Sequence, residues 1–140
     1  LRVAASAGML TPTRVLASAW PKAAFESKTE AEALQAFFGT SDVTQSDQVS
    51  IKAPLQAENG AVVPIKVMTS LENVEGIAIC AIKNPRPYTT SLRVSGGGGG
   101  LYSTRIKMGQ TSPVNCYVKA GGKLYMASQE IKVTVGGCGG

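Results

Sequence analysis

The stretch that most clearly indicates the fold runs from Val114 to Val135 and reads VNCYVKA-GG-KLYMASQEIKVTV. Its first half places Val114, Cys116 and Val118 on one side of the chain, which is the period-two pattern of a β-strand with one buried face. The glycine pair at 121–122 then predicts a tight turn into a second strand. This stretch therefore predicts an antiparallel hairpin with Cys116 in or near the core.

Upstream, the same pattern of short extended segments recurs. Val49–Leu55 alternates apolar and polar residues, and Pro54 within it suggests an edge strand. Asn59-Gly60 predicts a hairpin turn into a strand over 61–69. Ile77–Ile82 is apolar on both faces, which is typical of a central strand.

Further strands are predicted at Tyr88–Val94 and Tyr102–Met108, after a loop at Asn84-Pro85-Arg86-Pro87 that cannot continue a ladder. The total is about seven short strands with turn signals roughly every 8 to 12 residues, the pattern of an immunoglobulin-like β-sandwich. We expect the sandwich to be antiparallel, because no helix separates one strand from the next.

One helix precedes the strands. Ser27 with Glu30, and Thr29 with Glu32, both have capping-box spacing, and Gly39 is a stop signal. The apolar stripe between these signals consists of Ala31, Leu34, Ala36, Phe37 and Phe38. We therefore expect a helical segment at 20–39 that docks on a β-sandwich at 40–135, followed by a C-terminal arm at 136–140.

Two interpretations of residues 1–19 stay open. Val3–Leu10 is apolar, and Ala17-Ser18-Ala19 has the small-x-small form of a signal-peptidase site, which indicates the end of an export signal. Alternatively, Thr11 and Pro12 begin a short extra helix, with proline at its first position.

The composition of the 140 residues excludes several classes of protein. No histidine is present, which removes the commonest general base and metal ligand and every Ser-His or Cys-His pair. The formal net charge is +5, but the 14 Lys and Arg residues are scattered singly, so nucleic acid is not an expected partner. No apolar run approaches the ~20 residues of a membrane span. We expect no enzyme activity, cofactor or metal.

The three cysteines differ in their surroundings. Cys80 lies within the apolar segment Ile77–Ile82, where a thiol behaves as a small buried hydrophobe. If its strand neighbours that of Cys116, a disulfide between them would leave Cys138 as the odd thiol. Cys138 lies between two glycine pairs, Gly136-Gly137 and Gly139-Gly140, and has no apolar neighbour to bury it.

The glycines around Cys138 give the tail backbone freedom and make it thin. From Val135 to the end the tail can extend roughly 16 Å at about 3.3 Å per residue, so the thiol could enter a narrow channel of another protein. The competing interpretation is a β-sandwich assembly or interaction module with an incidental terminal cysteine.

The tail, with Ile131–Val135 before it, resembles the C-terminus of the SoxY family of sulfur-carrier subunits in the Sox thiosulfate-oxidation system. Ala57–Ile65, the loop at 84–87 and Ser103–Met108 are also similar to that family. The sequence departs from the family at Gly96–Gly100, where members usually have a mixed loop. We interpret this run as an engineered loop replacement, or as residues without assigned side chains.

The resemblance implies that Cys138 is joined oxidatively to thiosulfate as a cysteine S-thiosulfonate. A haem c protein would make this conjugate, a hydrolase would remove sulfate, and a molybdenum-haem enzyme would oxidise the persulfide. It also implies a periplasmic location and a heterodimer with a SoxZ-like subunit, bound through an edge strand or the helix face near Phe37 and Phe38. Without that subunit, we expect self-association through this surface or a Cys138 disulfide.

Overall fold

Two sheets and two helices make up the computed structural model, which describes residues 22–93 and 100–134. The helices are α2 (Lys22–Glu26) and α3 (Glu30–Phe38). The strands are β1 (Val43–Gln45), β2 (Val49–Lys52), β3 (Gln56–Ala57), β4 (Val63–Thr69), β5 (Val74–Ala81), β6 (Tyr88–Arg93), β7 (Gly100–Ile106), β8 (Ser112–Ala120) and β9 (Lys123–Val133). The predictions for residues 1–19 and 136–140 lie outside the described residues, as does most of the Gly96–Gly100 run.

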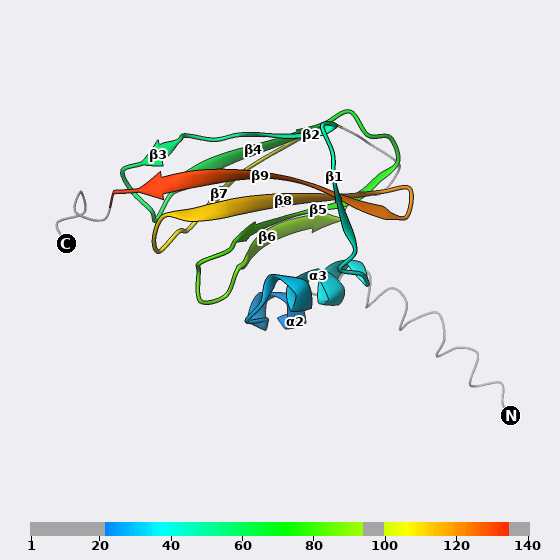
Figure 1. Cartoon of the computed structure of the whole chain (residues 1–140), viewed down its shortest axis with the longest axis horizontal. Coiled ribbons are helices and arrows are strands. Elements are labelled where there is room, and N and C mark those ends of the chain that lie inside the picture. The colour runs from blue at the N-terminus through cyan, green and yellow to red at the C-terminus, as the bar shows by residue number, and fades with distance from the viewer. Residues whose placement is uncertain (1–21, 94–99, 135–140) are drawn as a thin grey trace, which may run out of the picture.

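The two sheets form a sandwich, as the alternation of residues predicts (Figure 1). The larger sheet has the order β1-β9-β8-β5-β6, with β3 also on β9, and the smaller has the order β2-β4-β7. The core between them includes Ile65, Ile79 and Val118, which are almost fully buried. The predicted central strand is confirmed, because β5 pairs with both β6 and β8.

The predicted β8–β9 hairpin is also confirmed. The register runs from Ala120 opposite Lys123 back to Ser112 opposite Ile131. Gly121 and Gly122 form its turn with φ values of 58° and 81°, a region that favours glycine. The alternation holds as well, since Cys116 faces the sandwich core and Tyr117 faces the helices.

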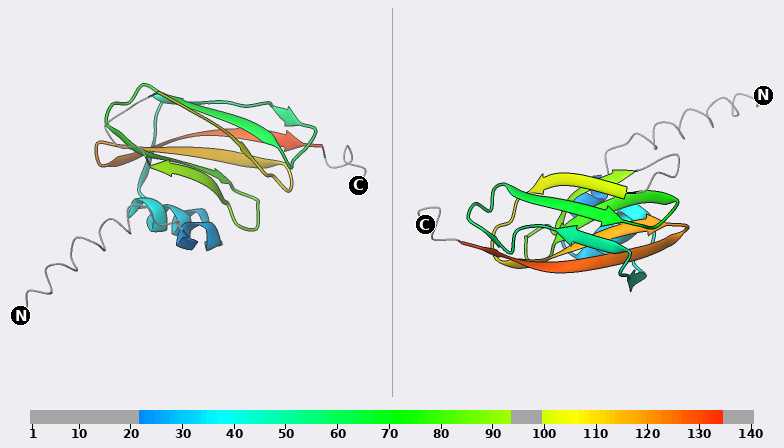
Figure 2. Two further views of the ribbon diagram at one scale, coloured as in Figure 1. Left: turned by 180° about the vertical axis from the view of Figure 1, so that it is seen from behind. Right: turned by 90° about the horizontal axis from the view of Figure 1, so that it is seen from above.

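The expectation of a purely antiparallel sheet is wrong at one edge. Both β1 and β3 pair with β9 in parallel, through Val43 opposite Leu124 and Gln56 opposite Lys132. The connections between these partners span most of the chain, so the pairing does not need the helical crossover of a short parallel unit. Figure 2 shows the same strands from behind and from above.

Helix α3 covers the outer face of the larger sheet (Figure 1). It is capped as predicted: Thr29 Oγ1 accepts from Glu32 N at 3.2 Å, and Gly39 ends the helix at φ 79°. Its buried residues are Ala33, Leu34, Phe37 and Phe38, whereas Ala31 and Ala36 of the predicted stripe are exposed. Because Phe37 and Phe38 pack on the chain's own sheet, they do not offer the helix face that was one of the two partner surfaces we expected.

Two basic side chains of the sheet donate hydrogen bonds to the last carbonyls of α3. Arg93 of β6 donates to the Phe37 carbonyl at 3.0 Å and lies 4.4 Å from the centre of the Phe37 ring. Lys119 of β8 donates to the Phe38 carbonyl, also at 3.0 Å. Cations near the last carbonyls of a helix satisfy acceptors that the helix leaves open and interact well with its dipole.

Replacing Arg93 by alanine is expected to lower the free energy of unfolding by about 1 to 2 kcal/mol, because the charged hydrogen bond and the ring contact are both lost. Urea denaturation measures this change. Arg86→Ala is the matched control, since Arg86 lies in an exposed loop. Equal midpoints for Arg93→Ala and the wild type would contradict the helix attachment described above.

Candidate functional site

Cys138 is the predicted point of sulfur attachment, and its flanking glycines are predicted to make the arm flexible; these glycines are Gly136, Gly137, Gly139 and Gly140. All five residues lie outside the described residues. The structure describes the strand that leads to them, as far as Thr134. The candidate site is therefore the root of the C-terminal arm, which we define as Lys132–Thr134 with the residues that hold it. Its position decides where the arm begins and in which direction it leaves the sandwich.

One side of the root is held by the segment around β3. Lys132 N donates to the Leu55 carbonyl at 2.9 Å, and Thr134 N donates to the Ala57 carbonyl at 3.0 Å. The Gln56 side chain adds a bond from Nε2 to Thr134 Oγ1 at 2.7 Å. Successive backbone bonds on this edge continue the sheet to the last described residue.

The opposite side of the root is held by a side chain. Val133 N donates to Thr111 Oγ1 at 2.9 Å, and Ile131 just before it is fully buried in the core. Strand β9 is thus hydrogen-bonded along both edges as far as Val133, two residues beyond the buried Ile131. Starting from a fixed Thr134, Cys138 is four residues away, a reach of roughly 13 Å at about 3.3 Å per residue.

Sequence reasoning missed this anchor. A two-residue strand such as β3 leaves almost no periodic signal, and no sequence motif marks Thr111. The sequence signal closest to β3 was Asn59-Gly60, which we interpreted as a hairpin turn from β2 into β4. These strands do pair antiparallel, with Lys52 opposite Lys66, but the chain between them first crosses to β9.

Gly60 has a different role from the one expected of a turn glycine, because it lacks the positive φ of a type I′ turn. Its carbonyl accepts from Met108 N at 2.7 Å. A Cβ at Gly60 would collide with the Met108 carbonyl oxygen and would lie 3.1 Å from Val133 Cγ1. Glycine is therefore required here for close packing beneath the arm root.

A shallow groove of about 410 Å³ lies beside the root. Gly60, Met108 and Val133 line it together with Lys107, whose ammonium is the only charged group among the lining residues. The side chain of Lys107 is exposed, so the arm begins next to a positive charge.

The other two cysteines lie on neighbouring strands, β5 and β8, but on opposite faces of the sheet. Cys116 is opposite Ile79 and points into the sandwich core, while Cys80 points toward the helices. Both are free thiols. The hypothesis of a Cys80–Cys116 disulfide is therefore wrong, because alternation directs the two sulfurs to opposite sides of the sheet.

Burial makes both of these thiols poor nucleophiles. It raises the pKa of Cys116 to about 12. Burial also raises the pKa of Cys80 well above its ordinary value, with smaller contributions from the negative charges of Glu30 and Cys116. Because the thiolate is the reactive form, neither thiol suits sulfur chemistry at neutral pH.

In the native protein, iodoacetamide at pH 8 is expected to modify one cysteine, and in denaturant it is expected to modify all three. The reason is that Cys80 and Cys116 are fully buried and keep their protons. Intact mass spectrometry counts the adducts, and peptide mapping assigns the native adduct to Cys138. Rapid native modification of Cys80 or Cys116 would contradict this account of the core.

The described residues contain no group of three or more Cys, Asp or Glu side chains placed to hold a metal ion. Within the same part of the chain, no helix is long and apolar enough to cross a membrane.

The fold and the site define a small β-sandwich protein in which an anchored strand leads to a glycine-flanked terminal cysteine. The family described as "Sulfur oxidation protein SoxY" matches residues 34–138, which include Cys138. The chain belongs to the SoxY family.

A solved structure supports the same assignment. It is that of the sulfur carrier protein SoxY from Chlorobium limicola f thiosulfatophilum, with 40% identity and a TM-score of 0.66. The match covers 74% of this chain and 94% of that one. An engineered protein also matches, at 10% identity and a TM-score of 0.42 over 63% of this chain and 20% of its own, too distant to support an argument. No curated protein matches the chain.

Proposed function

We propose that the chain holds sulfur intermediates covalently on Cys138 and presents them to separate enzymes of sulfur oxidation. The observation that most supports this is the arm root, which is bonded on both edges as far as Val133 and on the β3 edge as far as Thr134. The glycine-flanked cysteine follows it after Val135. Burial of the other two thiols leaves Cys138 as the candidate for attachment. The similarity to a sulfur carrier of the same family points the same way.

In the proposed chemistry the carrier contributes one reactive group, the Cys138 thiol. Joining this thiol to thiosulfate forms an S–S bond and releases one proton and two electrons. The proton goes to solvent, and a haem c protein accepts the electrons. A hydrolase would then add water to the sulfonate sulfur and break its bond to the neighbouring sulfur, which releases sulfate and leaves a persulfide on the arm. A molybdenum-haem enzyme removes electrons from the persulfide sulfur while water supplies the oxygens.

The proposal includes the source of thiol activation and the partners. Residues 135–140 include no basic side chain that would favour the thiolate of Cys138, so we assign activation to the active site of the enzyme that receives the arm. A SoxZ-like subunit would complete a heterodimer, and the compartment would be the periplasm. In the absence of that subunit, self-association through the freed surface or a Cys138 disulfide would follow.

Truncation after Val135 tests the proposal against an assembly module. The truncated chain is expected to keep its melting temperature, because the described contacts end at Thr134, and to lose all support of thiosulfate oxidation by the reconstituted enzymes. An assembly module would lose nothing. Thiosulfate-dependent reduction of cytochrome c measures the support, and full activity of the truncated chain would refute the carrier function.

A further inference from the structure

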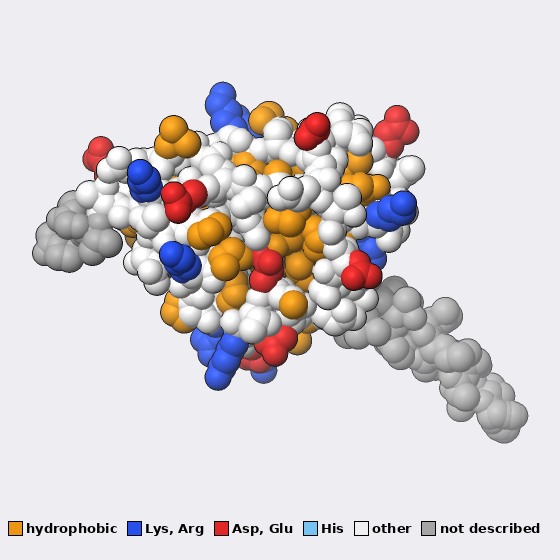
Figure 3. Space-filling view, in the orientation of Figure 1, with side chains coloured by type: hydrophobic (Ala, Val, Ile, Leu, Met, Phe, Trp, Pro, Cys, Tyr) orange, Lys and Arg blue, Asp and Glu red, His pale blue; other side chains and the backbone are white. Residues whose placement is uncertain are grey.

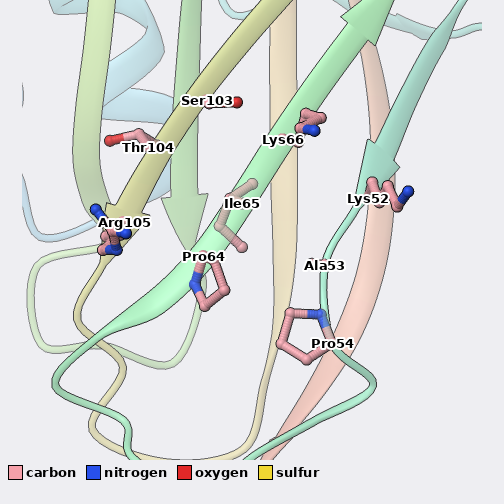
Figure 4. Close-up of a pocket in the computed structure, with 9 residues that line it drawn as sticks. All are labelled: Lys52, Ala53, Pro54, Pro64, Ile65, Lys66, Ser103, Thr104 and Arg105. Atoms are coloured by element: carbon pink, nitrogen blue, oxygen red, sulfur yellow. The ribbon is translucent and has the colours of Figure 1, made fainter.

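Three cations gather on the outer face of the smaller sheet, the face that the helices do not cover. Lys52 lies on β2, Lys66 on β4 and Arg105 on β7, so each strand of the sheet contributes one (Figure 4). Lys52 is directly opposite Lys66 in the register. Like charges at directly opposite positions destabilise a sheet, so the fold itself gains nothing from this pairing.

These three side chains surround a groove of about 570 Å³. Pro54 and Pro64 provide apolar surface between the cations (Figure 4), and no acidic residue lines the groove. Within the described part of the chain, none of the three cations makes a hydrogen bond or an ion pair. By contrast, the face in Figure 3 shows charges of both signs interspersed.

The groove lies close to the root of the arm. Ala53 and Pro54 line it, and the next residue, Leu55, accepts the hydrogen bond from Lys132 N. The Ala53 carbonyl also accepts from Gln129 Nε2 of β9 at 3.2 Å. A protein seated in the groove would therefore stand beside the point where the arm leaves the sandwich.

We propose that this groove binds an acidic surface of the haem c protein that loads the arm. This inference rests on the proposed function. A second copy does not fit, because an isologous contact would bring the same three cations together. A permanent subunit interface would have a larger apolar core, whereas an open cationic groove favours fast, electrostatically steered and transient association.

The test uses the full chain and the haem c protein that loads the arm. The groove variant Lys52→Glu/Lys66→Glu/Arg105→Glu is compared with a control variant, Lys22→Glu/Lys28→Glu/Lys123→Glu, whose lysines are exposed and lie elsewhere. Both variants change the net charge equally. At low ionic strength the groove variant is expected to lose more than about tenfold in kcat/KM for thiosulfate loading, because steering is lost. High salt should remove most of this difference.

Further measurements separate the outcomes. Prolonged incubation with excess enzyme should load the groove variant fully, which shows that carrier chemistry is intact. The milder Lys52→Gln/Lys66→Gln/Arg105→Gln variant should give a smaller loss, and it replaces the triple glutamate variant if that does not fold.

Equal losses in the groove and control variants, or a loss in neither, would overturn the inference. Self-association of the wild type that the groove variant abolishes would overturn it too, since the occupant would be a second copy. If the wild type is never loaded, the proposed function fails and the inference fails with it.

Discussion

Deleting Gly136 and Gly137 is expected to lower the rate of sulfur transfer by more than about tenfold while leaving the fold intact. Thr134 is bonded to Gln56 and Ala57 on one edge, and its neighbour Val133 is bonded on the other edge. The arm therefore cannot gain length by detaching from the sheet without breaking those hydrogen bonds. The reach from Thr134 to Cys138 would fall from roughly 13 Å to roughly 7 Å. A thiol that stops short of a partner's active site loses its reaction geometry.

The matched control for this deletion replaces both glycines by serine and so keeps the length of the arm. We expect the serine variant to retain most of its activity, and we expect free Cys138 in both variants to react with iodoacetamide at the wild-type rate. Steady-state thiosulfate oxidation with the reconstituted enzymes measures the transfer. A deletion variant that turns over as fast as the wild type would show that reach is not limiting.

Gly60→Ala is expected to lower the free energy of unfolding by about 3 kcal/mol, the upper part of the range for overpacked sites. The added methyl group would collide with the Met108 carbonyl oxygen, which is backbone and cannot rotate away. It would also press on Val133, so the arm root should move. We therefore expect slower sulfur transfer in this variant as well as lower stability.

Gly109→Ala is the control for this substitution, because Gly109 lines the same groove and its added Cβ would meet only Asn84 Oδ1, at 3.9 Å. Its stability should change by less than about 0.5 kcal/mol. Urea denaturation of the two variants gives the comparison. Similar midpoints for Gly60→Ala and Gly109→Ala would contradict the close packing beneath the arm.

Local patterns explain what could be predicted from the sequence. The β8–β9 hairpin depends on alternation and on Gly121-Gly122, and α3 depends on Thr29, Glu32 and Gly39; all of these signals lie within a few residues of what they specify. The family likeness was also local, since it rested on the terminal pentapeptide and a few short segments. These elements were therefore predictable in type, and within a few residues in their bounds.

The arm root was not predictable, because its bonds join residues far apart in the chain. Gln56 and Lys132 are neighbours in the sheet, although most of the strands of the sandwich lie between them in the sequence. Nothing in the sequence near either residue indicates the other. The opposite orientation of Cys80 and Cys116 followed from alternation only once the register of β5 against β8 was known. The cationic groove is likewise assembled from three strands, each of which contributes a single basic residue.

The central claim is that Cys138 is the point of covalent sulfur attachment, and intact mass tests it most directly. The wild type and Cys138→Ser are incubated with thiosulfate and the haem c enzyme, and each is weighed with and without reductant. The account predicts one adduct with the mass of a bound thiosulfate on the wild type, removed by reductant and absent from Cys138→Ser. An adduct that persists in Cys138→Ser, or no adduct on folded and reduced wild-type protein, would contradict it.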